Sequence, residues 1–205
     1  MNDLVTIAGG FAETDAGSWL MGRGQPVAYF GEVTRRRRKG WLLRDRAALE
    51  LAETSGSARF AATDRPFLTH IPCAAPVNAV SSKVLLAPSS ARTGAETVKI
   101  VPMSIRNAIG TTVFGSGWVV MATASRTARI SVEDGDTLSV RPEAVVAWTG
   151  NRPTGFIRRL GILDVLLPRQ PRGLMLHFHG PCVVWLEGAK PESLATKMQR
   201  RVYGV

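Results

Sequence analysis

The sequence has little cysteine and little histidine, and both shortages exclude classes of protein. Only two cysteines, Cys73 and Cys182, occur in 205 residues, and neither lies in a Cys-X-X-Cys or Cys-X-X-His pair. This excludes a disulfide-stapled fold and a zinc-finger module, and it is typical of reduced, buried cysteines in a cytosolic protein. The three histidines leave few nitrogen ligands for a metal ion.

Long apolar runs and a targeting segment are also missing. The first ten residues have neither a basic start nor a long apolar stretch, so no secretory signal peptide is predicted. The longest uncharged stretch, residues 107–125, contains three glycines and several hydroxyl side chains. A membrane helix needs about 20 predominantly apolar residues. We therefore expect a soluble protein of the cytoplasm with no transmembrane segment.

Helical periodicity is scarce, and apolar residues recur at every second position or in short runs. Residues 128–132 and 138–140 alternate, whereas residues 27–30 and 144–148 are short apolar runs. The 20 glycines and 12 prolines stand singly between such runs. The pattern predicts an all-β fold, an antiparallel sandwich or barrel built from repeated hairpin units.

Two further signals concern the hairpin units. Asp134-Gly135 lies between two alternating segments, and Asp-Gly in that position predicts a hairpin. Segments that begin at Gly40, Gly117 and Gly173 each read as a glycine, an apolar strand, a turn and a second apolar strand. Repetition of such a unit predicts a pseudo-symmetric β body.

One segment near the C-terminus has the pattern of a short helix. Pro191 is allowed in a first helical turn, and Leu194 and Met198 are four residues apart and would share one face. We predict a single domain over residues 1–205, divisible into an N-terminal half (1–90), a C-terminal half (95–190) and a tail helix (191–205).

The last hundred residues contain motifs in a specific order. An acidic turn, Glu133-Asp134-Gly135-Asp136, precedes the strand end Val140-Arg141-Pro142, and Ala147-Trp148 ends the next strand. The closing motif is Phe178-His179-Gly180-Pro181-Cys182-Val183-Val184-Trp185-Leu186-Glu187. Over about residues 98–188 this order resembles the AIM24 family, formerly a domain of unknown function. Cys182 stands where the family motif has a second glycine, and Glu187 stands where it has glutamine.

The resemblance implies a fold similar to that of the trp RNA-binding attenuation protein, a β body of repeated units that often assembles into rings or trimers. It implies no catalytic residues and no cofactor. We therefore expect a non-enzymatic scaffold or binding protein that self-associates, most simply as a trimer. Strands bearing Trp118, Trp148 and Trp185 would add apolar surface that an assembly covers.

Basic residues exceed acidic ones, 26 against 16, which gives a net charge of +10. The densest run is Arg35-Arg36-Arg37-Arg38-Lys39, and five adjacent cations cannot share a packed interior. We expect this run to form an exposed loop between strands at 27–30 and 41–43. With Arg158 and Arg159 it supplies candidate polyanion-binding residues, and a solvated loop without a ligand is the alternative.

The partners open to such a surface are nucleic acid, an anionic lipid surface or an acidic protein. The second hypothesis for function is therefore an RNA-binding protein that uses its basic surface.

His177 and His179 have the only spacing that resembles a metal site. Residues two apart on a strand share a face, so both imidazoles can reach one ion. A cupin-type centre adds an acid and a distant histidine, and here the next acid is Glu187 and the third histidine is His70. A metal-dependent cupin-like enzyme is the third hypothesis, weighed against two histidines on a half-exposed strand. No metal is assigned, and the sequence contains neither Gly-X-Ser-X-Gly nor His-Glu-X-X-His.

Overall fold

The computed structural model describes residues 6–8, 10–22, 27–36, 49–101, 105–115, 117–157 and 173–188. These segments are almost entirely antiparallel β-strand, and their helices are two short 3-10 turns, η2 (Ser81–Lys83) and η3 (Pro142–Ala144). The all-β prediction is confirmed, whereas the predicted tail helix at 191–205 lies outside the described residues. No helix in the described segments is long and apolar enough to span a bilayer.

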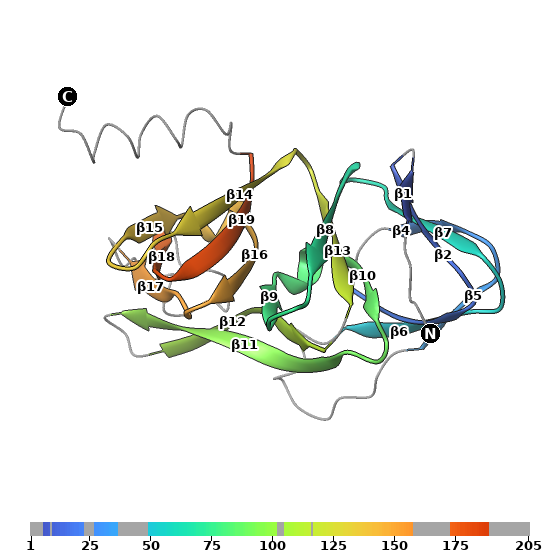
Figure 1. Ribbon diagram of the computed structural model, residues 1–205, viewed down its shortest axis with the longest axis horizontal. Helices are drawn as coiled ribbons and strands as arrows, with labels where there is room; N and C mark the ends of the chain where they lie inside the picture. Colours follow the sequence, from blue (N-terminus) through green and yellow to red (C-terminus); the bar gives the residue numbers. More distant parts are fainter. Residues whose placement is uncertain are drawn as a thin grey trace.

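In this part of the chain, nineteen strands form three sheets (Figure 1). The four-stranded sheet has the order β1 (Thr6–Ala8), β2 (Phe11–Thr14), β7 (Ala58–Ala62), β4 (Val27–Phe30). The six-stranded sheet has the order β5 (Val33–Arg36), β6 (Glu50–Thr54), β3 (Gly17–Met21), β10 (Val84–Pro88), β13 (Trp118–Thr123), β8 (Phe67–Pro72).

The nine-stranded sheet has the order β14 (Thr127–Val132), β19 (Cys182–Glu187), β16 (Val145–Gly150), β9 (Val77–Ala79), β12 (Ile105–Phe114), β11 (Arg92–Val101), β17 (Thr154–Ile157), β18 (Leu174–His179), β15 (Thr137–Val140). The pairing of β11 with β17 is parallel, and the other pairings of the described strands are antiparallel. In Figure 1, β1–β7 lie at one end of the molecule and β14–β19 at the other.

The same arrangement of bent strands occurs twice. In the N-terminal unit, β2–β3, β4–β5 and β6–β7 are each one bent chain segment, and β6–β7 lies between the other two. In the C-terminal unit, β14–β15, β16–β17 and β18–β19 follow the same chain order, and β18–β19 lies in the middle. The repeated unit is therefore a set of three bent strands, which differs from the glycine-led hairpins expected from the sequence.

Gly31 and Gly150 lie at equivalent corners of the two units, between β4 and β5 and between β16 and β17. Their φ angles are 104° and 86°, a region that favours glycine. A Cβ at Gly31 would lie 2.9 Å from the Ser57 carbonyl oxygen, and one at Gly150 would lie 2.7 Å from that of Pro181. In each unit, the corner of the edge strand thus packs against the corner of the middle strand.

The acidic turn Glu133–Asp136 is present, but it does not form the predicted hairpin. The Asp136 N–H donates to the Glu133 carbonyl, as in a tight turn. However, β14 pairs with β19 and β15 pairs with β18, so the two flanking strands do not pair with each other. The turn is instead a corner of one bent strand. Gly180 donates its N–H to the Asp136 carbonyl, and a Cβ at Gly180 would overlap the Glu133 carbonyl oxygen.

Buried apolar side chains form three clusters. One lies in the N-terminal unit around Phe60, where the four-stranded sheet packs on β10 and β13. Another fills the C-terminal unit around Trp148. The third contains Leu20 of β3, Val146 of β16 and Trp185 of β19, together with residues of β8–β13. This shared core joins the two units.

The arginine run begins inside a strand, not in the loop that the sequence predicted. Arg35 and Arg36 are the last residues of β5, which pairs with β6, and the turn after β4 lies at residues 31–32. The prediction of a loop is therefore wrong for these two residues, because β5 pairs with β6, whereas their exposure is as predicted. Arg37, Arg38 and Lys39 lie outside the described residues, as does the strand expected at 41–43.

Candidate functional site

Both described arginines of the basic run contact a carboxylate on the neighbouring strand. Arg35 Nη2 lies 2.7 Å from Glu50 Oε2, and Arg36 Nε lies 3.3 Å from Glu53 Oε2. The Arg36–Glu53 pair is exposed and adds little stability, whereas Glu50 is buried. Each acid reduces the positive potential that a phosphate would meet. These two residues therefore do not form an unopposed polyanion site.

The described segments as a whole carry balanced charge. They contain twelve of the 26 basic residues and twelve of the 16 acidic residues. The net charge of +10 therefore belongs to the rest of the chain, which includes Arg37–Lys39, Arg158 and Arg159.

His177 and His179 lie on one face of β18, as their spacing predicts. His177 Nδ1 is 2.8 Å from Ser139 Oγ, and His179 Nδ1 is 3.0 Å from Thr137 Oγ1, both on the adjacent β15. His70, by contrast, lies on β8. Among the described side chains, no group of three or more His, Cys, Asp or Glu is placed to hold a metal ion. The described residues thus bring together two ligands of a cupin-type centre and not the third.

A buried ion pair was missed by reasoning from the sequence. Lys83 Nζ lies 2.5 Å from Glu187 Oε1 and also donates to the carbonyl oxygens of Glu143 and Val145, at 2.6 and 2.8 Å. Burial lowers the pKa of Lys83, and the contact with Glu187 opposes part of that shift. A single lysine among serines and valines carries no pattern that indicates burial. Glu187 is the counter-ion of this lysine.

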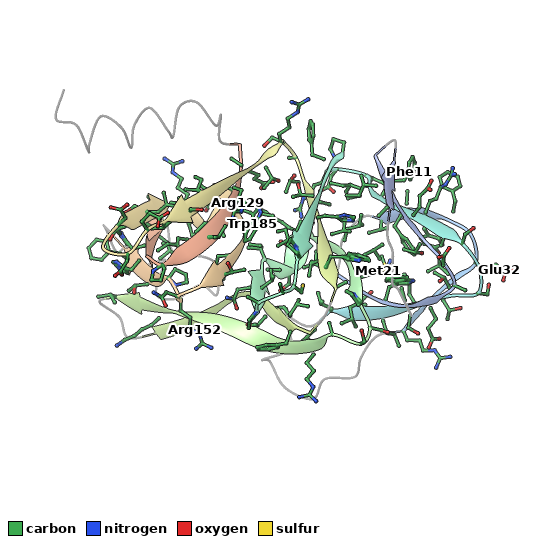
Figure 2. All side chains as sticks on the ribbon, in the orientation of Figure 1. Phe11, Met21, Glu32, Arg129, Arg152 and Trp185 are labelled. Atoms are coloured by element: carbon green, nitrogen blue, oxygen red, sulfur yellow. The ribbon has the colours of Figure 1, made fainter. Side chains whose placement is uncertain are left out.

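The most exposed large apolar side chain lies on β4, at the edge of the four-stranded sheet. Phe30 is 63% exposed and Tyr29 is 43% exposed. The Tyr29 ring faces inward, with its centroid 6.4 Å from that of buried Phe60. Phe30 faces outward, with its ring centroid 5.9 Å from that of Phe11. Glu32, at the corner that follows β4, lies at the end of the molecule farthest from the C-terminal unit (Figure 2).

The equivalent strand of the C-terminal unit has a covered edge. There, β16 pairs with β9 and β17 pairs with β11. Trp148, two residues before Gly150 as Tyr29 is before Gly31, is fully buried. In the described part of the chain, no strand pairs with the outer edge of β4 or β5. The outer edge of β4 is thus unpaired among the described strands whereas that of β16 is paired, and we take the β4 edge as the candidate interaction site.

The fold and this site define an all-β protein built from two similar units of bent strands, in which the outer edge of β4 is unpaired among the described strands. The chain matches no protein-family model and no curated protein sequence. Among solved structures, it is similar to the crystal structure of protein SPYM3_0169 from Streptococcus pyogenes, a structural-genomics target. The TM-score is 0.65 and the identity 16%, over 97% of this chain and 98% of the other. At this identity the likeness shows a shared fold and no activity.

Proposed function

We propose that this protein is a cytoplasmic, non-enzymatic β scaffold that works by self-association, as its resemblance to the AIM24 family implies. The observation that supports the proposal is the free edge of β4 with its exposed Phe30 and Tyr29. An edge strand presents unpaired N–H and C=O groups, which are a template for pairing with another chain. Exposed aromatic side chains at such an edge favour burial in an assembly.

Light scattering coupled to size-exclusion chromatography tests self-association directly. The expected result is a mass that is a multiple of the chain mass of 22.1 kDa at micromolar concentration. A mass of 22.1 kDa under the same conditions would contradict the proposal.

A second candidate function is polyanion binding, with RNA as the first ligand to test. The uneven charge distribution favours it, because 14 of the 26 basic residues but only four of the 16 acidic ones lie outside the described segments. Filter binding with RNA and DNA, beside flotation with anionic liposomes, separates nucleic acid from lipid as the ligand.

Two variants locate the charges that act in such binding. Replacing Arg35–Lys39 by serine should weaken binding and reduce the log–log salt slope by about 0.9 for each phosphate of duplex DNA that the variant no longer neutralises. Replacing only Arg35 and Arg36 should have a smaller effect, since both contact acids. Equal binding by the wild type and the five-residue variant would exclude the run as a ligand site.

A further inference from the structure

We infer that the free edge of β4 pairs, across a two-fold axis, with β4 of a second copy of this chain. The inference rests on the proposed self-association and names the surface that would carry it. In the C-terminal unit, the equivalent edge is closed by β9, which runs antiparallel to β16. The N-terminal unit repeats the strand arrangement without that covering strand among its described residues. Its edge therefore has the geometry that accepts an antiparallel strand.

The β4 strand has neither a proline nor a charge within it, two of the devices by which proteins protect exposed strands. Its residues are Val27-Ala28-Tyr29-Phe30, and valine, tyrosine and phenylalanine favour strands. By contrast, β8 includes Pro72 as its last residue, and proline cannot donate to a ladder. The other exposed edge nearby, β5, carries two arginines. Of these three edges, β4 is the one open to pairing.

A second copy fits this edge because the strand is self-complementary. Two β4 strands brought together bury no charge, so no ion is left without a partner. The one ion pair beside Phe30 on the outer face, Arg59 Nε to Glu13 Oε1 at 2.8 Å, is already neutral. The pairing would join two four-stranded sheets into one continuous sheet and cover Phe30 and Tyr29 of both copies.

The alternation of side chains restricts the register of this pairing. Directly opposed residues of antiparallel strands lie on the same face, so inward Tyr29 must oppose an inward residue and outward Phe30 an outward one. A register centred on Tyr29 satisfies both conditions. It sets Tyr29 against Tyr29 of the second copy, and each Phe30 against the small Ala28. Centring on Ala28 would leave Phe30 without an opposed residue of β4, and centring on Phe30 would bring Glu32 into the ladder.

Disulfide cross-linking tests both the surface and the register. Opposed residues have Cβ atoms about 4.5–5.5 Å apart, close enough for a disulfide after small adjustment, whereas diagonal neighbours are about 7–8 Å apart. Tyr29→Cys should therefore form a disulfide-linked dimer on mild oxidation. Mixing the Ala28→Cys and Phe30→Cys proteins should give a mixed disulfide in higher yield than either protein alone. The mixed disulfide still tests the register if loss of the Tyr29 ring weakens the contact, because both of these variants keep Tyr29.

The native cysteines should not interfere with the cross-linking, and one control variant measures cross-linking by random collision. Cys73 and Cys182 are buried, and burial raises the pKa of both thiols, that of Cys73 to about 11, so neither reacts readily in the folded protein. Thr69→Cys on β8, the free edge with prolines, should not cross-link. Equal cross-linking of Thr69→Cys and Tyr29→Cys would indicate random collision and overturn the inference.

Light scattering of the wild type separates failure of this inference from failure of the proposed function. A two-fold contact gives a dimer, whereas the sequence favoured a trimer. A dimer together with the Tyr29→Cys or mixed disulfide supports the inference. A trimer, or a dimer in which neither disulfide forms, overturns the β4 pairing and leaves self-association in place. A monomeric wild type without cross-links overturns both.

Discussion

Lys83 and Glu187 form a buried ion pair that connects two sheets of the molecule. Lys83 precedes β10 of the six-stranded sheet, and Glu187 ends β19 of the nine-stranded sheet. Their side chains are 7% and 19% exposed, and the Lys83 ammonium has an acceptor for each of its three protons. The hydrogen-bonding capacity of the Lys83 ammonium is therefore fully used. Removal of either residue of the pair leaves the charge of the other poorly compensated.

Glu187→Gln, which replaces the carboxylate by an uncharged amide of similar shape, should destabilise the fold. We expect a loss of about 3 kcal/mol in the free energy of unfolding, near the low end for a broken buried pair, because Lys83 keeps its two carbonyl acceptors. Urea denaturation measures the change. The double variant Lys83→Met, Glu187→Gln should recover part of the loss, since it removes the unpaired charge. A single variant as stable as the wild type would show that the pair contributes no net stability.

The pH dependence of the Glu187→Gln variant provides a second test of the same pair. Burial lowers the pKa of Lys83 below its ordinary value of 10.5, and Glu187 opposes that shift. Without Glu187 the pKa of Lys83 falls further. Between the folded-state pKa and 10.5 the unfolded chain binds more protons than the folded one, so stability rises with pH in that window. The variant should therefore recover stability, relative to the wild type, between neutral pH and about pH 10. A constant difference between the two proteins over this range would contradict the argument.

Phe30→Glu should weaken self-association without unfolding the chain. Phe30 is 63% exposed in the single chain, so its replacement should change the folding free energy by no more than about 0.5 kcal/mol. Burial of a phenylalanine in a contact contributes about 1.5–3 kcal/mol, and about 1.4 kcal/mol is a factor of ten in affinity. The dissociation constant should rise at least tenfold in analytical ultracentrifugation. Phe114→Glu, at a residue 41% exposed on β12, is the matched control and should leave it unchanged.

Gly150→Ala and Gly135→Ala compare two corners with the same backbone conformation. Both glycines have a φ of 86°, and a left-handed conformation costs an alanine about 1–2 kcal/mol. At Gly135 the added methyl meets open space, but at Gly150 it lies 2.7 Å from the Pro181 carbonyl oxygen. Gly150→Ala should therefore lower the thermal unfolding midpoint clearly more than Gly135→Ala. Equal midpoints would show that the close approach of the two corners is absent in solution.

Local patterns in the sequence predicted several of the individual strands. The alternating segments at 128–132 and 138–140 are β14 and β15, and the apolar runs at 27–30 and 144–148 correspond to β4 and β16. These assignments succeeded because side-chain alternation and a turn residue are properties of a few neighbouring residues.

Features that depend on distant partners could not be predicted in this way. The sequence predicted the turn at Glu133–Asp136 but not the partners of the two strands beside it. Those partners, β19 for β14 and β18 for β15, come much later in the chain. Arg35 lies in a strand because β5 pairs with β6, a later part of the chain that also carries its partner Glu50. The shared face of His177 and His179 was predicted from spacing, whereas the hydroxyl groups that contact them come from β15.

The core shared by the two units has a consequence for how the chain unfolds. Leu20, Val146 and Trp185 come from both ends of the sequence and are buried in one cluster. Separating the halves would expose this cluster to water, so neither half can melt at a lower temperature while the other stays intact. The two units should therefore unfold in a single cooperative transition in calorimetry, although each has its own set of three bent strands.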